Sequence, residues 1–291
     1  MDRITGLTSL TARFVLWLLA HSPLSLARFC SGLLDWGLPR LRRTAVRNLE
    51  MAYPEKTPAE RKVIVDEVFR SIARLLYAFA RFPQMNRANI GDWIRYEGLE
   101  HYLEAKKLGR GVLIATAHFG NWELSAFAHG FMTEPMNIVI RPLDNPAVDR
   151  LVEDRRQLSG NRLIEKWDGA RAILRALQQN EAVGILIDQN TSLQEGVFVN
   201  FFGTPACANT AFAKIAARTG AAVIPGFAAW SEKEQKYVLR FYPPVEISGE
   251  PAEDTRRLHA KLEEVIRENP GQWLWIHRRW KTRPPGESSI Y

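Results

Sequence analysis

Cysteine is nearly absent from this 291-residue chain, which has only Cys30 and Cys207. Two thiols cannot form a disulfide framework or a cysteine-rich metal site, and low cysteine content is typical of a reducing compartment. The chain also has no G-x-S-x-G elbow, no G-x-x-x-x-G-K-[ST] loop and no G-x-G-x-x-G turn between a strand and a helix. Its 6 histidines form no H-x-H or H-E-x-x-H pair. We therefore expect neither a metal ion nor a bound cofactor.

Long apolar runs are missing as well. His21, Pro23 and Arg28 interrupt the apolar stretch between residues 14 and 34, so no run reaches the ~20 residues that a spanning helix needs. No cleavage site typical of a signal peptide follows. Arginines cluster just beyond, at Arg40, Arg42, Arg43 and Arg47. We predict that residues 4–36 form helices that lie on or dip into the cytoplasmic face of a membrane; two ordinary packed helices are the alternative.

Positive charge predominates, with 39 Lys and Arg against 32 Asp and Glu and a formal net charge of +7. Such a balance suggests a polyanionic partner, which could be nucleic acid, an anionic bilayer or an acidic carrier protein. Charge alone does not choose among these. The 46% hydrophobic content is enough for a substantial core, so we expect a globular protein.

Apolar runs of strand length alternate with helical patterns along most of the chain. We predict strands at residues 112–117, 137–140, 183–187, 222–229 and 238–242, the last beside the fourth. We predict helices at residues 57–82, 121–132, 145–159, 169–180, 209–219 and 254–268. Continuous apolar strands between helices favour an α/β fold with a mainly parallel central sheet flanked by helices. The simplest division is an N-terminal helical, membrane-associating region at 1–56 and an α/β domain at 57–291.

Three polar residues directly follow predicted strands. They are His118, Arg141 and Asp188. The carboxyl ends of parallel strands meet at one edge of a sheet, where ligands bind in open α/β folds. A lone histidine after a strand is more often structural, but three such residues at one edge favour a site.

The segment from His118 to Glu123 (HFGNWE) sharpens this hypothesis. In a continuous helix the two side chains would point about 140° apart. If His118 ends the strand, Gly120 makes the turn and Asn121 caps the next helix, Glu123 can reach back to the imidazole. A carboxylate on one ring nitrogen leaves the other as a proton acceptor, which makes a general base for a hydroxyl. Without a protein nucleophile beside the base, direct attack by that hydroxyl is the simplest mechanism.

Several blocks in order resemble a known family. The segment AHFGNWE resembles the histidine-x4-acid motif of the glycerolipid acyltransferases, in the glutamate form of the lipid A late acyltransferases. Four further blocks are similar to that family: residues 47–55, residues 140–146, residues 188–189 with 196–203 and 213–225, and residues 272–281. The chain departs from enteric members at Asn190, where those carry an acid.

The resemblance implies an O-acyltransferase of glycerolipid acyltransferase-like fold, with His118 as base and Glu123 as its partner. Arg141, Asp188, Asn121 and Gly203 are then the predicted substrate-binding residues. The family's donor is an acyl thioester, on acyl carrier protein or coenzyme A, and its acceptor is a hydroxyl of an anionic glycolipid such as a lipid A precursor. The implied location is the cytoplasmic face of the inner membrane, peripheral or monotopic.

Other readings stay open. Another glycolipid, a phospholipid or an aminolipid could be the acceptor, and a catalytically silent lipid-binding protein could share the fold. A group of tryptophans and basic residues at positions 273–281 could form an interfacial belt or close the core. The family context argues against the same group binding nucleic acid.

Overall fold

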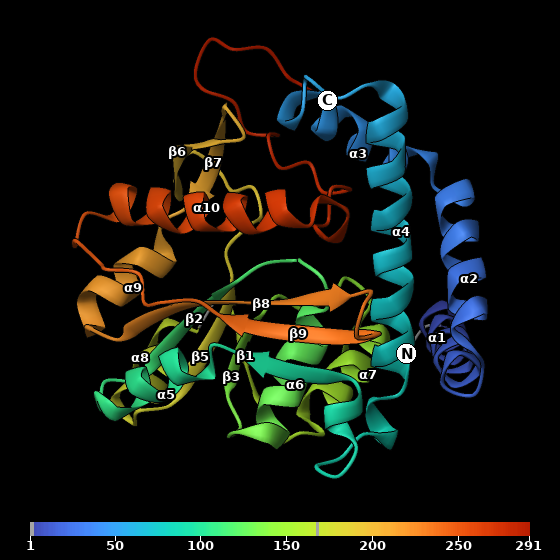
Figure 1. Cartoon of the computed structure of the whole chain (residues 1–291), viewed down its shortest axis with the longest axis horizontal. Helices are drawn as coiled ribbons and strands as arrows, with labels where there is room; N and C mark the ends of the chain where they lie inside the picture. The colour runs from blue at the N-terminus through green and yellow to red at the C-terminus, as the bar shows by residue number, and fades with distance from the viewer. Residues whose placement is uncertain (1–2, 167–168) are drawn as a thin grey trace.

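Seven strands form the central sheet in the computed structural model, which describes residues 3–166 and 169–291 (Figure 1). Their order is β1-β9-β8-β2-β5-β3-β4. The strands are β1 (Ile94–Glu97), β2 (Val112–Thr116), β3 (Asn137–Ile140), β4 (Arg162–Glu165), β5 (Ala182–Leu186), β8 (Ala222–Ser231) and β9 (Lys236–Phe241). All neighbours run parallel except β8 and β9. The predicted mainly parallel sheet, with its last two strands adjacent, is confirmed.

Helices cover both faces of this sheet. Along β2 the side chains alternate: Val112 and Ile114 pack toward α5 (Leu99–Lys107) and α6 (Trp122–Met132). Leu113 and Ala115 pack toward α8 (Ala170–Gln178), α9 (Ala211–Thr219) and α10 (Pro251–Glu268). This period of two explains why the buried strands read as continuous apolar runs. The remaining crossover helix is α7 (Pro146–Gln157).

The N-terminal segment is helical. It comprises α1 (Arg3–Ala20), α2 (Leu24–Gly37) and α3 (Pro39–Ala52), which pack along α4 (Pro58–Ala80) (Figure 1). The break after α1 falls at the predicted polar residues, and Thr57 caps α4 in a box with Glu60. No helix in the described ranges is long and apolar enough to cross a membrane. Association with a membrane and the division at residue 56 stay predictions.

A third core layer joins the helices to the end of the chain. Leu49 of α3, Val65 of α4 and Ile266 of α10 pack with Trp273, Trp275 and other buried aromatic residues. All three tryptophans of this region, including Trp280, are at most 1% exposed. They close the core, so an interfacial belt of these rings is wrong.

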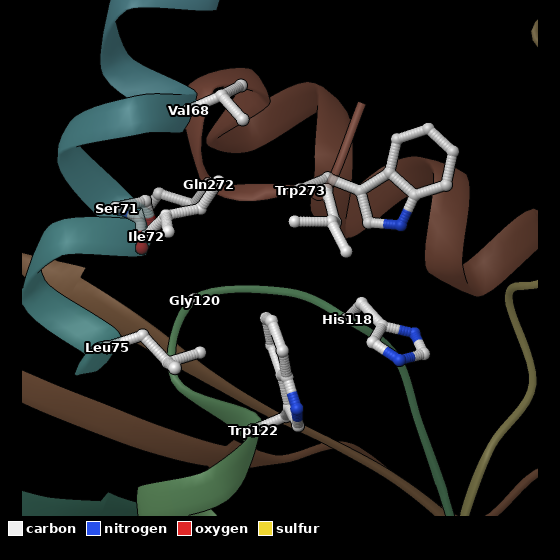
Figure 2. Close-up of a pocket in the computed structure, with 10 residues that line it drawn as sticks. Val68, Ser71, Ile72, Leu75, His118, Gly120, Trp122, Gln272 and Trp273 are labelled. Carbon is white, nitrogen blue, oxygen red and sulfur yellow. The ribbon is translucent and has the colours of Figure 1, made fainter. Parts of the chain in front are cut away.

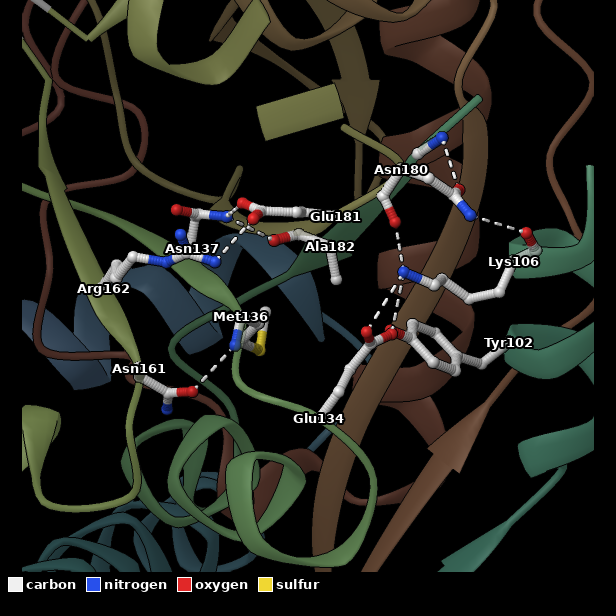
Figure 3. A network of polar contacts seen from close by, with 11 residues as sticks. Tyr102, Lys106, Glu134, Met136, Asn137, Asn161, Arg162, Asn180, Glu181 and Ala182 are labelled. Atoms are coloured by element: carbon white, nitrogen blue, oxygen red, sulfur yellow. Dashed lines mark hydrogen bonds and ion pairs between the residues drawn. The ribbon is translucent and has the colours of Figure 1, made fainter. Parts of the chain in front are cut away.

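A polar network fixes the amino-terminal edge of the sheet (Figure 3). Lys106 of α5 pairs with Glu134 at 2.9 Å and donates to the carbonyl of Asn180. Glu181, just before β5, accepts from Asn137 at 2.8 Å and from Arg162 at 2.6 Å, at the starts of β3 and β4. These bonds join several strand starts on the edge of the sheet away from the predicted site.

Some elements escaped prediction. They are β1, β4, α5 and an antiparallel hairpin of β6 (Gly196–Phe201) and β7 (Thr204–Asn209). β1 and β4 are short, and most of their residues remain partly exposed, so neither reads as an apolar run.

Candidate active site

The loop between β2 and α6 holds His118 beside two other segments. The Gly120 N–H donates to the Gln272 carbonyl at 2.8 Å, and the Leu274 N–H donates to the His118 carbonyl at 3.0 Å. Gly120 has φ +54°, and a Cβ there would lie 1.8 Å from the Ala228 carbonyl oxygen. Only glycine fits this turn without displacement of the backbone.

After this turn the chain enters α6, as predicted. Asn121 is fully buried, and its Oδ1 accepts the Leu124 N–H at 3.0 Å. Its capping role is confirmed, and its contact with substrate stays a prediction. The Trp122 ring then packs edge-on against the His118 imidazole, with centroids 5.0 Å apart.

The carboxylate that contacts the imidazole belongs to Asp188. Its Oδ1 lies 2.9 Å from His118 Nδ1, and its Oδ2 accepts the His118 backbone N–H at 3.1 Å. The Trp273 indole N–H donates to the same Oδ2 at 2.8 Å. With Nδ1 donating to Asp188, Nε2 is the nitrogen left to accept a proton.

Burial and charge act in opposite directions on this pair. Burial lowers the pKa of His118, but the adjacent Asp188 carboxylate and the more distant charge of Glu123 together raise that pKa above its usual value. Burial raises the pKa of Asp188, yet His118 and the Trp273 N–H hold it far below its usual range. Asp188 therefore stays ionised and stabilises the imidazolium form of His118.

Glu123 occupies a different place from the one predicted. Its carboxylate forms a double ion pair with Arg156 of α7, with N···O distances of 2.8 and 2.6 Å, and accepts from the Trp122 indole at 3.2 Å. The expected direct contact of Glu123 with the imidazole is therefore wrong, because α6 begins in a direction that turns Glu123 toward α7. Only 17% of the Arg156 side chain and 12% of that of Glu123 are exposed.

Sequence reasoning missed the residues that hold the loop after Asp188. The Asn190 N–H donates to His277 Nε2 at 3.1 Å, and the Asn190 side chain bonds Thr282 at 2.9 Å. Burial lowers the pKa of His277 to about 4, so this ring is neutral and can accept that bond. The bonds place the Gln189 amide 3.4 Å from His118 Nε2. The family-like block at residues 272–281 pointed to the segment that contains His277, but it gave no sign of the hydrogen bond between His277 and Asn190.

A hollow opens on the other side of the imidazole (Figure 2). It lies between α4, the His118 loop and the segment at 272–274, and it is small: its empty volume is about 190 Å³ with the open solvent at its mouth included. Apolar side chains form most of its wall: Val68, Ile72, Leu75, Trp122, Trp273 and Leu274.

Two other predicted residues lie apart from this geometry. Arg141 follows β3, is 70% exposed and pairs with Asp144 at 3.5 Å. Gly203 has φ +76° in the β6–β7 turn, with open space around it. Substrate binding by either stays a prediction. Across residues 3–166 and 169–291, no group of three or more His, Cys, Asp or Glu side chains is arranged to hold a metal ion.

Comparisons with known proteins agree with the motifs. Residues 4–282 match the family model described as bacterial lipid A biosynthesis acyltransferase. The Escherichia coli lipid A biosynthesis lauroyltransferase is 32% identical over 95% of this chain and 92% of its own. The Escherichia coli palmitoleoyltransferase is 30% identical over 87% of this chain and 83% of its own. A Haemophilus influenzae lipid A biosynthesis acyltransferase is 27% identical over 94% and 87%. The chain belongs to the bacterial lipid A biosynthesis acyltransferase family and is an acyltransferase.

Proposed function

We propose that this enzyme transfers a fatty acyl group from an acyl thioester to a hydroxyl of a lipid A precursor or a related glycolipid, with His118 as general base. The observation that carries the proposal is the imidazole with Nδ1 on Asp188, at the edge of an apolar hollow. Relatives named for lauroyl and palmitoleoyl transfer in lipid A biosynthesis support this class of acceptor.

The chemistry needs one base and no protein nucleophile. His118 Nε2 takes the proton of the acceptor hydroxyl as its oxygen attacks the thioester carbonyl carbon. Asp188 holds the tautomer and stabilises the imidazolium. When the C–S bond breaks, the imidazolium returns its proton to the leaving thiolate. The acyl ester and the free thiol are the products.

Glu123 supports this base from a distance. Its negative charge helps to raise the pKa of His118, whereas the charge of its partner Arg156 lowers that pKa. The two bonds from Arg156 hold the Glu123 carboxylate in place at the start of α6. Glu123 is therefore a positioning and electrostatic residue in our mechanism, and Asp188 is the direct partner of the imidazole.

We propose acyl carrier protein as the donor's carrier. The net charge of +7 suits an acidic carrier and an anionic acceptor. Acyl-coenzyme A is the competing donor. Matched kinetics with the two thioesters of one acyl group would choose between them, since the carrier should give the higher kcat/KM and lose that advantage in high salt.

We also propose that α1 and α2 bind the enzyme peripherally to the cytoplasmic face of the inner membrane. Large apolar side chains of both helices face solvent: Leu10, Phe14, Trp17, Phe29, Leu33 and Trp36. Trp36 is 84% exposed, which is costly in water and favourable at a lipid interface. Arginines in the adjoining α3 would add attraction to anionic lipids.

Mass spectrometry of lipids tests the function directly. Lipid A-type glycolipids from cells with the gene should carry one acyl group more than those from cells without it. Purified enzyme should restore that mass from a labelled acyl thioester. If the glycolipids are identical and a phospholipid or aminolipid changes instead, the acceptor assignment is wrong. If no lipid gains an acyl group, the proposed activity fails.

A further inference from the structure

Arg155 of α7 is a partly buried cation that has no carboxylate in contact. Its Nε atom is buried without a hydrogen-bond partner, and its Nη1 atom makes one long bond, to the Leu151 carbonyl at 3.5 Å. The neighbouring Asp154 is exposed, and among the residues that the structure describes no ion pair joins it to Arg155. Buried charges in proteins are normally paired. The surroundings of Arg155 therefore lack the anion that such a group needs.

A second arginine lies near Arg155 across a helix–helix contact. Burial lowers the pKa of Arg155, and the positive charge of Arg13 of α1 lowers that pKa further. The helices α1 and α7 are in contact (Figure 1), and Leu16 and Val152, three residues from the two arginines, pack against the same core cluster. Two positive charges so placed repel each other unless an anion lies between them.

This arginine pair, Arg13 and Arg155, lies between the apolar surface of α1 and the active site. Arg13 shares one helical face with large exposed apolar side chains: Leu10, Phe14 and Trp17. On α7 the next residue, Arg156, forms the double ion pair at the start of α6. An anion held by the arginine pair would therefore lie where an apolar surface meets positive charge, one helical position from the support of the catalytic loop.

We propose that Arg13 and Arg155 form a binding site for the phosphate group of an anionic lipid. The inference rests on the proposed membrane association of α1 and α2. Phosphate oxygens accept hydrogen bonds from both guanidinium groups, which gives the buried Nε of Arg155 an acceptor and removes the repulsion within the pair. The lipid chains would then lie against the exposed apolar face of α1. Two lipids supply this chemistry, a membrane phospholipid and a glycolipid acceptor that carries phosphate, and the test separates them.

The first test is flotation of the full-length protein with two kinds of vesicle, phosphatidylcholine alone and phosphatidylcholine with phosphatidylglycerol. Arg13→Gln and Arg155→Gln should each weaken binding to the second kind by about tenfold and leave binding to the first unchanged. Because both side chains hold one phosphate, the double variant should lose less than the product of the two single losses. Arg155→Lys keeps the charge but not the planar fork, so its binding should lie between those of the wild type and Arg155→Gln.

Arg150→Gln is the matched control. It removes the same charge from an exposed position of the same helix, about 140° around the axis from Arg155. It should keep the wild-type preference for vesicles with phosphatidylglycerol. Thermal unfolding adds a second readout. Without lipid, Arg155→Gln should unfold at or above the Tm of the wild type, because the charge that it removes has no partner in the free protein.

Kinetics with the acceptor identify the source of the phosphate. The glycolipid acceptor, either intact or treated with phosphatase, is compared in detergent micelles that contain no phospholipid. If the site binds the acceptor, Arg155→Gln should raise KM for the intact glycolipid by about tenfold and should not raise KM for the treated one. If the site binds phospholipid, the loss in flotation remains and KM for the intact glycolipid does not rise. Either result supports a site for lipid phosphate.

Other results would overturn the site. They include vesicle binding and KM values that match the wild type in folded Arg13→Gln and Arg155→Gln, above all if Arg155→Gln is also less stable, since Arg155 would then be structural. An equal loss for Arg150→Gln, or additive losses in the double variant, would mean attraction to net charge alone. Wild-type protein that floats with neither vesicle and does not distinguish the two acceptors contradicts the membrane proposal and this site together. An absence of acyl transfer contradicts the proposed function alone, because flotation still decides the site.

Discussion

His118 and its carboxylate partner lie 70 positions apart in the sequence. The pairing of β2 with β5 brings them together, because Thr116 and Leu186 are register partners at the strand ends. The residues that follow each strand then enter the site. Both residues could be placed at the sheet edge from the sequence. Their direct contact could not, because it depends on register and on the direction in which each loop leaves its strand.

Replacing Asp188 with Asn tests this contact. The variant loses the charge that raises the pKa of His118 but keeps the burial that lowers it, so the acid limb of kcat against pH should move to lower pH. Turnover at neutral pH should fall by about 10²–10⁴-fold, because the imidazolium loses its stabilising charge and the tautomer is no longer fixed. Stopped assays over a pH series give both numbers.

Trp273→Phe is the companion variant, since it removes one hydrogen bond to Asp188 and keeps the carboxylate. Its effect on turnover should be smaller. An acid limb that stays in place in Asp188→Asn would show that Asp188 does not control the ionisation of His118.

A second prediction concerns the ion pair of Glu123 and Arg156. Arg156→Ala leaves Glu123 partly buried without its cation, so the free energy of unfolding should fall by about 1–3 kcal/mol. Turnover should also fall, because the carboxylate is no longer held near the base. Arg156→Lys keeps the charge but cannot form both hydrogen bonds to the Glu123 carboxylate. Its stability and turnover should therefore lie between those of the wild type and of Arg156→Ala.

Denaturant unfolding and kinetics measure the two effects separately. If Glu123→Gln has wild-type turnover while Arg156→Ala is less stable, the pair is structural only and Glu123 has no part in catalysis.

At the scale of elements, the turn from β2 into α6 shows why the motif has a glycine. Gly120→Ala should destabilise the protein strongly, because its Cβ would collide with the Ala228 carbonyl. Gly203→Ala also forces a positive φ but meets open space, so it should cost only about 1 kcal/mol. Thermal unfolding of the two variants should therefore differ clearly.

The Gly203 variant has a second use. A loss of transfer without a matching loss of stability would support the predicted contact of Gly203 with substrate. Equal stability of the two alanine variants would contradict the close approach at Gly120.

The α1–α2 surface gives a prediction about lipid. Phe29→Ser and Trp36→Ser should each weaken binding to vesicles that contain anionic lipid by roughly tenfold or more, because each removes an exposed aromatic ring from the interface. Flotation assays measure the bound fraction. Leu108→Ser, an exposed apolar position after α5, should bind like the wild type. Wild-type protein that stays in solution beside such vesicles at low salt would contradict the membrane proposal.

The elements that could be predicted are those with strong local signals. The five apolar strands β2, β3, β5, β8 and β9 and the helix α4, with its Thr57 cap, follow directly from the sequence pattern. β1 and β4 could not be predicted, since edge strands of four residues carry little apolar signal. The N-terminal helices were expected from the apolar pattern. Their packing along α4 was not, because it depends on tertiary contacts that no local pattern encodes.

At the scale of the whole molecule, the structural polar network and the candidate catalytic residues lie at opposite edges of the central sheet. The polar network of Lys106, Glu134 and Glu181 joins the strand starts (Figure 3). The opposite edge of the sheet carries His118 and Asp188. The C-terminal segment closes the site, because Trp273 bonds Asp188 from a buried core. The sheet edge and the base could therefore be predicted from the sequence. The contribution of the C-terminal segment required the three-dimensional structure.

The central claim is that His118 deprotonates the acceptor hydroxyl. The most direct measurement is acyl transfer from a labelled thioester by folded His118→Ala protein, with a parallel search for acylated enzyme in the wild type. Our account predicts a loss of ~10²–10⁴-fold in turnover, little change in acceptor binding and no acyl-enzyme. Undiminished transfer by that variant, or an acyl-enzyme that forms and decays as fast as turnover, would contradict it.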